Sequence, residues 1–194
     1  MKRICVFCGS NPGRQPEYRM AAVRLADALV ERGLSLVYGG ASVGLMGEIT
    51  DAMLARGGEV FGVIPNPIVS RELARKGLTE LRVVNSMHER KAVMADLSDG
   101  FIAMPGGFGT LEEFFEVVTW GQLGIHRKPF GLLNVCDYFG GLLRFLDHCV
   151  EEQFLKPRHR EIILVASEPD VLLDQLERYQ HPGDDKWINR RRES

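Results

Sequence analysis

Three carboxylates directly follow a glycine-rich loop in the middle of this chain. Residues 104–120 read MPGGFGTLEEFFEVVTW, with the loop at Pro105–Thr110 and the acids at Glu112, Glu113 and Glu116. A glycine loop that opens a helix typically binds an anion, because its backbone N–H groups can approach closely and the helix dipole is positive there. A carboxylate does different chemistry, as a general base or as a stabiliser of positive charge. The segment therefore indicates two functions side by side.

Glu113 has two interpretations that spacing alone leaves open. Thr110 and Glu113 have the T-x-x-E spacing of a capping box, which stabilises a helix without any catalytic role. Glu113 and Glu116 are also three residues apart and share a helix face with Val117. Two like charges on such a half-apolar face cost free energy unless water or a cation relieves them, which is more typical of a catalytic site.

A second charged segment, SMHERK, places Arg90 and Lys91 in the first two turns of an expected helix. Ser86 and Glu89 have capping-box spacing, and we interpret Glu89 as part of that cap. Cations near the positive end of a helix dipole are disfavoured by about 0.3–1 kcal/mol. Arg90 and Lys91 therefore belong either to a solvated face or to a site for a phosphate or a leaving group.

The elements that must position these residues follow from hydrophobic periodicity. We expect strands at 4–7, 34–38, 60–64, 81–84, 101–104, 130–135 and 162–165, and helices at 16–32, 45–56, 86–97, 110–123, 138–154 and 171–179. Apolar strands that alternate with helices predict a parallel sheet covered on both faces. Right-handed crossovers then give an α/β, Rossmann-like, doubly wound and mainly parallel sheet with helices on both faces, in a single domain.

Three loops that follow expected strands are rich in small residues: Cys8–Gly13, Gly39–Gly44 and Pro105–Thr110. In a doubly wound sheet such loops gather at the carboxyl edge, where ligands bind. Neither the dinucleotide fingerprint G-x-G-x-x-G nor the Walker pattern occurs in them, which weakens the cofactor-enzyme and ATPase interpretations. Turns need glycine in any case, but three such loops at one edge favour a phosphate site.

Size and composition predict one domain with a short tail. The chain has 194 residues, 45% hydrophobic and 26% charged, with a formal net charge of −2. This near-balance gives no field that would attract nucleic acid or a membrane surface. No apolar run approaches the ~18 residues of a membrane span, and the first apolar run is too short for a signal peptide. We expect a domain over residues 1–181 and a polar C-terminal tail over 182–194.

The four cysteines favour a reduced protein without a metal site. Cys5 and Cys8 form a C-x-x-C, but they lie in a strand-like run, where odd spacing directs two side chains to opposite faces. We therefore expect neither a redox pair nor a zinc site, and no cofactor. Reduced cysteines in the core suit a cytoplasmic protein.

Taken together, these residues resemble the LONELY GUY (LOG) family, the cytokinin-activating phosphoribohydrolases. The family motif P-G-G-x-G-T-x-x-E is met by Pro105–Glu113, and M-H-x-R-K by Met87–Lys91. The likeness extends through the CGS loop, YGGASVGLMG, the T-W-x-Q-L-G-x-H run at Thr119–His126 and KPxGLLNV at Lys128–Val135. Members were long labelled lysine decarboxylases, but nothing here suggests a pyridoxal enzyme. Asn11 and Ala41 depart from the residues that many relatives have at these loop positions.

The resemblance implies a reaction and a set of residues. Water cleaves the N-glycosidic bond of a nucleoside 5′-monophosphate, releasing a purine-type base (N6-substituted adenine in the family, with AMP an allied substrate) and ribose 5-phosphate. By position, Arg90 and Glu113 are the catalytic pair, with no metal. The substrate site is lined by these two and by Glu72, Lys91, Gly107, Phe108, Gly109, Thr110, Leu111, Glu112 and Thr119. A homodimer or higher homo-oligomer is also implied, because relatives have the site near a dimer interface.

The loop and the acids can act on different parts of the nucleotide, which would explain why acids follow the loop. We expect N–H groups of Gly107–Thr110 to hold the phosphate, while Glu113 lies beside the sugar, where oxocarbenium-like charge develops. Arg90 would position the substrate or neutralise the departing base. Two alternatives remain open at this point: an AMP nucleosidase without preference for modified bases, and a nucleotide-binding module without catalysis. The helix at Phe114–Trp120 could equally belong to an interface or to the core.

Overall fold

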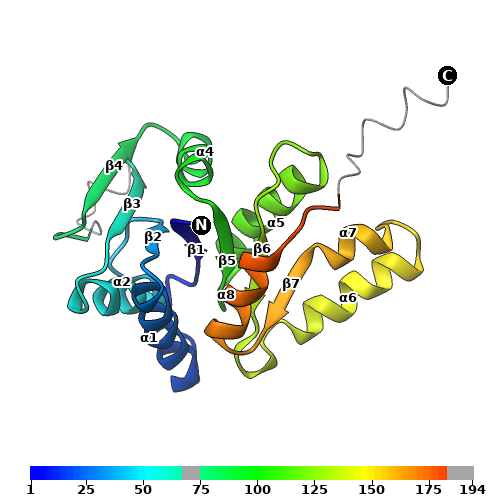
Figure 1. Cartoon of the computed structure of the whole chain (residues 1–194), viewed down its shortest axis with the longest axis horizontal. Coiled ribbons are helices and arrows are strands. Elements are labelled where there is room, and N and C mark those ends of the chain that lie inside the picture. The colour runs from blue at the N-terminus through cyan, green and yellow to red at the C-terminus, as the bar shows by residue number, and fades with distance from the viewer. Residues whose placement is uncertain (67–74, 183–194) are drawn as a thin grey trace.

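The architecture is one parallel sheet between two layers of helices (Figure 1). A computed structural model describes residues 1–66 and 75–182. The strands are β1 (Arg3–Phe7), β2 (Ser35–Tyr38), β3 (Val60–Pro65), β4 (Glu80–Val84), β5 (Gly100–Ala103), β6 (Phe130–Leu133) and β7 (Ile163–Ala166). The helices are α1 (Pro16–Glu31), α2 (Gly44–Ala55), α4 (Met87–Leu97), α5 (Phe108–Gln122), α6 (Gly140–Glu151), α7 (Pro157–Glu161) and α8 (Pro169–Arg178), with a 3-10 turn η1 (Val135–Asp137).

The strand order β4-β3-β2-β1-β5-β6-β7 confirms the doubly wound fold. Every neighbouring pair is parallel, so the sheet is wholly parallel where the sequence predicted a mainly parallel one. The chain starts in the centre at β1, moves outward to β4, and returns to β5 on the other side of β1. The carboxyl ends of β1 and β5 therefore form the switch point at which ligands bind in such sheets.

Alternating side chains divide the core between the two faces of the sheet. Ile4 and Val6 of β1 pack with α1, α2 and α8, whereas Cys5 and Phe7 pack with α4, α5 and α6. All four side chains are at most 3% exposed. The two-residue period of a strand thus places the apolar residues of β1 against both helix layers.

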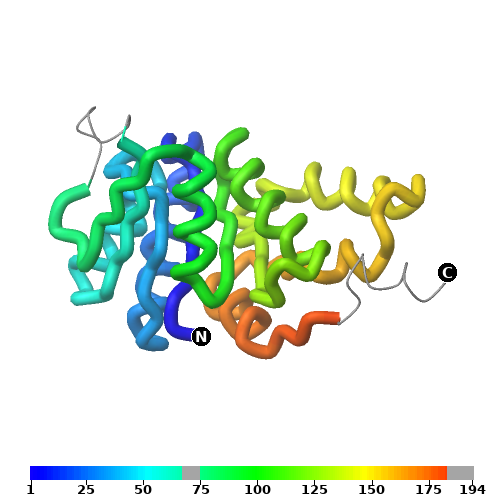
Figure 2. Tube along the Cα trace, turned by 90° about the horizontal axis from the view of Figure 1, so that it is seen from above, coloured from blue at the N-terminus to red at the C-terminus, as the bar shows by residue number. Residues whose placement is uncertain are grey.

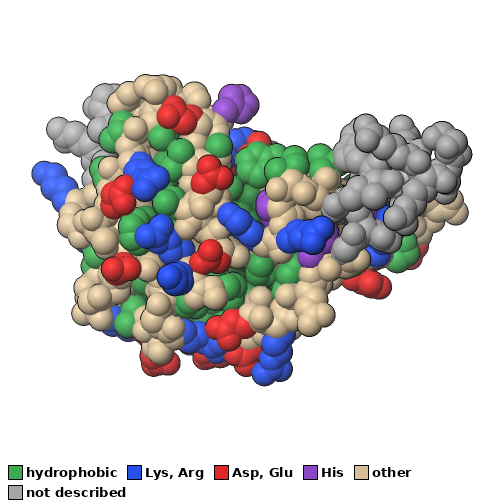
Figure 3. All heavy atoms as spheres, turned by 45° about the horizontal axis from the view of Figure 1, so that its top comes forward, with side chains coloured by type: hydrophobic (Ala, Val, Ile, Leu, Met, Phe, Trp, Pro, Cys, Tyr) green, Lys and Arg blue, Asp and Glu red, His purple; other side chains and the backbone are tan. Residues whose placement is uncertain are grey.

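Helices α4 and α5 lie side by side on one face of the sheet, as the views in Figures 1 and 2 agree. Of the two alternatives for the helix at Phe114–Trp120, interface or core, burial favours the core: Phe114, Val117 and Val118 of α5 are 0%, 3% and 8% exposed. Figure 3 shows basic and acidic side chains interspersed on the face that carries these helices. None of the helices in the described ranges is both long and apolar enough to cross a membrane.

The sequence missed α7 and misplaced the starts of α5 and α6. Helix α7 has five residues, too few to give a periodic signal. Helix α5 begins at Phe108, two residues before the expected start, and α6 begins at Gly140 because Cys136 and Asp137 before it are left-handed. Beyond Pro182, the predicted tail lies outside the described residues.

Candidate active site

A pocket of about 510 Å³ opens at the switch point of the sheet. This volume is within the ~300–1,000 Å³ typical of small-molecule sites. The structure brings all three glycine-rich loops to it, together with α4 and α5. The lining residues include Cys8–Gly13, Gly39, Ala41, Met46, Arg90, Pro105–Thr110, Glu112, Glu113 and Tyr138.

The loop after β5 presents the amino end of α5 to this pocket. Gly107 is the N-cap of α5 in extended conformation, with no side-chain cap, and its carbonyl accepts the N–H of Leu111 at 3.1 Å. The first N–H groups of a helix have no acceptor within the helix, so those of Phe108–Thr110 are available to an anion. Gly106 must be glycine, because an added Cβ would overlap the Thr110 hydroxyl and approach the backbone nitrogen of Gly9 to 2.9 Å.

Arg90 of α4 is a buried cation held from several sides. It is 9% exposed, its Nε donates to the Val63 carbonyl at 3.1 Å, and one terminal nitrogen donates to Glu113 Oε1 at 2.5 Å. Gly39 makes room for the guanidinium, since an added Cβ there would overlap its other terminal nitrogen. A charge so fixed keeps one orientation toward the pocket, which electrostatic catalysis requires.

Glu113 is the partner of Arg90 and does not cap α5. Because α5 begins at Phe108, Glu113 lies well inside the helix, and its side chain is 11% exposed against the guanidinium. The capping-box interpretation of Thr110 and Glu113 is therefore wrong. Burial, the largest influence, raises the pKa of Glu113 above its usual value, although Arg90 counteracts it in part. A carboxyl pKa that is raised by burial beside a charged partner is typical of active sites.

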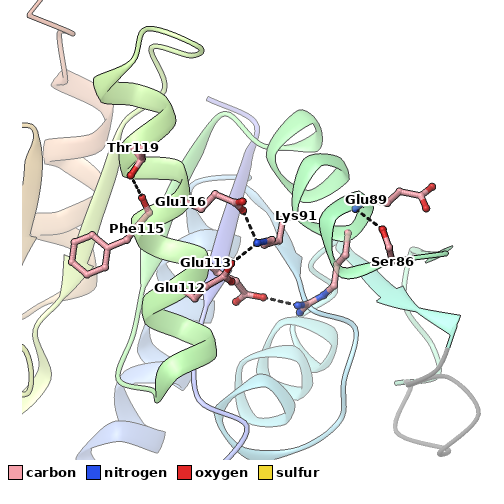
Figure 4. A network of polar contacts seen from close by, with 9 residues as sticks. Ser86, Glu89, Lys91, Glu112, Glu113, Phe115, Glu116 and Thr119 are labelled. Carbon is pink, nitrogen blue, oxygen red and sulfur yellow. Dashed lines mark hydrogen bonds and ion pairs between the residues drawn. The ribbon is translucent and has the colours of Figure 1, made fainter. Parts of the chain in front are cut away.

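The other expected cap is confirmed. The Ser86 hydroxyl accepts the N–H of Glu89 at 3.1 Å (Figure 4). The Glu89 carboxylate accepts the N–H of Asn85 at 2.8 Å. This cap starts α4 at Met87, so that Arg90 falls in its first turn and points toward α5. Glu89 thus positions the catalytic candidate through the backbone.

Lys91 lies between two carboxylates of α5 (Figure 4). Its ammonium donates to Glu112 and lies 3.1 Å from Glu116, and its side chain is 9% exposed. Burial lowers its pKa, but the two carboxylates outweigh this effect and the pKa is raised. Lys91 therefore neutralises the acids beside Glu113 and joins α4 to α5, while it is not among the residues that line the pocket.

The remaining site candidates divide into those at the pocket and those away from it. Gly107, Phe108, Gly109, Thr110 and Glu112 line it with Arg90 and Glu113. Leu111 packs against the core, and the exposed Thr119 donates its hydroxyl to the Phe115 carbonyl at 2.6 Å, about 13 Å along the helix from Thr110. Glu72 lies outside the described residues. A substrate contact for Lys91, Leu111, Thr119 and Glu72 stays a prediction.

Sequence reasoning did not select several lining residues. Tyr18, Met46, Met87 and Tyr138 each contribute to the pocket wall. Tyr138 follows β6, and a position just after a strand is the signal that would have found it. The two methionines and Tyr18 lie in helical patterns that also fit a core, so the sequence held no comparable signal for them.

The C-x-x-C thiols point to opposite faces, as predicted. Cys5 packs in the layer of α4 and α5, and Cys8 in the layer of α1 and α2. All four cysteines are free, and burial raises the pKa of both Cys5 and Cys8. Within residues 1–66 and 75–182, no group of three or more His, Cys, Asp or Glu side chains is placed to hold a metal ion.

The fold and the site define a class: a Rossmann-like α/β protein in which a glycine-rich loop at the amino end of a helix and a buried Arg–Glu pair lie at the switch point. The family model described as "Possible lysine decarboxylase" matches residues 46–176. The chain is 55% identical over 184 residues (95% of this chain, 75% of the relative) to "Probable cytokinin riboside 5'-monophosphate phosphoribohydrolase LOGL5" of Oryza sativa subsp. japonica. It is 52% identical over 95% of its length, and 85% of the relative, to "Cytokinin riboside 5'-monophosphate phosphoribohydrolase LOG7" of Arabidopsis thaliana. The chain therefore belongs to the LOG family, which confirms the resemblance.

Solved structures show the same fold at low sequence identity. The molybdenum cofactor carrier protein of Chlamydomonas reinhardtii aligns with a TM-score of 0.69 at 20% identity, over 92% of this chain and 99% of that one. The molybdenum cofactor binding protein of Rippkaea orientalis aligns with a TM-score of 0.69 at 21% identity, over 91% of this chain and 96% of that one. These likenesses describe the fold alone.

Proposed function

We propose that this protein is an N-glycosyl hydrolase that cleaves N6-modified adenosine 5′-monophosphate to the free base and ribose 5-phosphate. The observation that carries the proposal is the buried Arg90–Glu113 pair, 2.5 Å apart, in the same pocket as the open helix end at Gly107–Thr110. The names of the LOG relatives, at 52–55% identity, support the same reaction.

In the proposed mechanism, the phosphate binds the N–H groups of Gly107–Thr110, and the ribose lies beside Glu113. The bond between C1′ and the base nitrogen breaks, and its electron pair leaves with the base. The Glu113 carboxylate stabilises the positive charge at C1′ and accepts a proton from the water that adds there. Arg90 orients Glu113 and offsets negative charge on the base. The base takes up a proton on release and Glu113 gives up the proton that it accepted from water, so that the carboxylate is restored. Water is the one co-reactant that this scheme needs.

Substitution of the two residues tests the mechanism. We expect Glu113→Gln and Arg90→Ala each to lower kcat/KM by about 10²–10⁴-fold, because proton transfer and charge stabilisation of this kind contribute about that much. The measurement is chromatographic release of base from AMP and from N6-isopentenyl-AMP. Full activity in both folded variants would end the assignment.

The wild-type protein in the same assay separates the alternatives. A thermal shift with AMP but no base released over hours would favour a binding module without catalysis. Equal rates on the two nucleotides would favour an AMP nucleosidase without preference for modified bases. A higher kcat/KM for the N6-isopentenyl nucleotide is the expected result.

We also propose that the protein forms a homodimer or a higher homo-oligomer. Two aromatic side chains at α6 support this: Phe145 is 61% exposed, and Phe154, just after the helix, is 90% exposed. Large aromatic residues in such positions are enriched at interfaces between proteins.

A cytoplasmic location is proposed from the four free cysteines, because thiols persist in reducing compartments.

A further inference from the structure

The carbonyl of Gly106 is held by a residue from another crossover of the fold. The Tyr138 hydroxyl, just after the η1 turn, donates to it at 2.6 Å. Neighbouring parts of the loop are fixed by backbone bonds, from the Gly9 N–H to the Pro105 carbonyl at 3.0 Å and from the Leu111 N–H to the Gly107 carbonyl at 3.1 Å. The peptide between Gly106 and Gly107 therefore depends on Tyr138 for its orientation.

Fixing this carbonyl also fixes an N–H group. The peptide unit is planar and trans, so the Gly106 carbonyl and the Gly107 N–H point in opposite directions and turn together. Gly107 begins the row of N–H groups that, in the proposed function, binds the phosphate. A tyrosine hydroxyl carries one proton, and here the Gly106 carbonyl accepts it. Any effect of this hydroxyl proton on a ligand would therefore pass through the orientation of the peptide.

The turn that carries Tyr138 is held in an unfavourable conformation. Cys136 and Asp137 have φ of 51° and 55°, in the left-handed region that residues with a Cβ rarely adopt. The Asn134 side chain braces the turn, since it donates to the Asp137 carboxylate at 3.0 Å and accepts the N–H of Phe139 at 2.7 Å. Strain that is maintained in this way next to a pocket indicates a positional requirement.

Aromatic contacts direct the Tyr138 ring toward the loop. Its centroid lies 5.0 Å from that of Phe139 and 5.8 Å from that of Tyr18, both edge to face. Tyr18 belongs to α1, so the ring is supported from two elements before its hydroxyl reaches Gly106. These contacts favour the rotamer that directs the hydroxyl to Gly106, in a residue that is 44% exposed.

From these contacts we propose that Tyr138 is a positioning residue for phosphate binding, which orients the Gly106–Gly107 peptide of the anion loop. This inference rests on the proposed function, because it assigns the loop to the 5′-phosphate. It attributes to Tyr138 an effect on affinity for the phosphate end of the ligand and none on the bond-breaking step. The effect should be common to every ligand that carries the ribose 5-phosphate group.

The test is Tyr138→Phe, which keeps the ring and removes the hydroxyl. The Kd values for ribose 5-phosphate and for AMP, measured by calorimetry, should both rise about fivefold or more, since a hydrogen bond of about 1 kcal/mol is lost. In the activity assay KM should rise by a similar factor, with kcat within about twofold of wild type. Tyr179→Phe is the matched control, because its buried hydroxyl lies outside the pocket and finds no hydrogen-bond partner among the described residues.

The outcomes separate this inference from the proposed function. Unchanged affinity for ribose 5-phosphate in Tyr138→Phe, with wild-type protein binding it, overturns the role of Tyr138 and leaves the hydrolase assignment intact. A fall in kcat with constant KM also overturns it, because that would place Tyr138 in the chemical step. Absence of ribose 5-phosphate binding by the wild-type protein contradicts both.

Discussion

At the scale of single residues, Arg90 depends on a neighbour that has no side chain. The guanidinium occupies the space where a Cβ at position 39 would lie, and the Val63 carbonyl and Glu113 hold it there. Breaking a buried charge pair from one side leaves the other charge uncompensated, at a cost of about 3–5 kcal/mol. Arg90→Ala is therefore expected to lose stability as well as activity, so its folding must be verified, whereas Glu113→Gln keeps a hydrogen-bonding partner for the cation.

The pH dependence of catalysis is a prediction at this scale. Burial raises the pKa of Glu113, and the proposed mechanism needs its carboxylate. As pH falls through the raised pKa, Glu113 takes up a proton and kcat/KM should decline, at a higher pH than the usual carboxyl value of ~4.3. The pH profile of kcat/KM for AMP measures this. Glu112→Gln should keep an acid limb but move it to lower pH, because the Glu112 charge contributes to the raised pKa of Glu113. An acid limb at or below the usual carboxyl value in the wild-type protein would contradict the assignment.

At the scale of elements, Lys91 joins α4 to α5 through Glu112 and Glu116, and so keeps the helix of Arg90 beside the helix of Glu113. The carboxylate partners in these ion pairs are partly exposed, since the Glu116 side chain is 25% exposed and the Glu112 side chain 55%. Solvent screens such pairs, so each contributes on the order of 1 kcal/mol or less. The arrangement also removes the repulsion that three carboxylates on one helix would otherwise have.

A double-mutant cycle tests this connection. Lys91→Met should lower the free energy of unfolding by about 1–2 kcal/mol, and Glu116→Gln by less, because Glu112 still pairs with the lysine. The double variant should be less destabilised than the sum, with a coupling of about 0.5 kcal/mol or more. Urea denaturation of the four proteins gives these values. Strict additivity would show that Lys91 and Glu116 do not interact in solution.

At the scale of the whole molecule, the α6–α7 end bears the proposed interface between copies. Phe154→Asp should shift the assembly toward the monomer, because a charge replaces an apolar anchor. Light scattering coupled to size-exclusion chromatography measures the mass. Val171→Asp serves as a comparison, since Val171 is 51% exposed on α8 and is part of neither α6 nor the pocket lining. A wild-type monomer at high concentration would contradict the proposal.

Much of the fold follows from local patterns. Strand β1 could be predicted because its residues are apolar on both faces, and α4 because Ser86 and Glu89 form a cap. Helix α7 and the left-handed turn at Cys136–Asp137 could not, since the first is too short for a period and the second lacks glycine. The turn's conformation depends on Asn134 and on contacts from α1, which sequence spacing does not reveal.

The sequence by itself determined the alternation of apolar strands with helices, the three glycine-rich loops, and the presence of one segment with cations and one with acids at helix starts. Only the tertiary structure decided that Glu113 pairs with Arg90 and does not cap α5. The T-x-x-E spacing is the same in both cases, and the outcome depends on where α5 begins and what faces the side chain. The tertiary structure also decided that Arg90 lines the pocket and that Lys91 does not. Adjacent residues on a helix point about 100° apart, so which of them reaches the pocket depends on how α4 packs against α5.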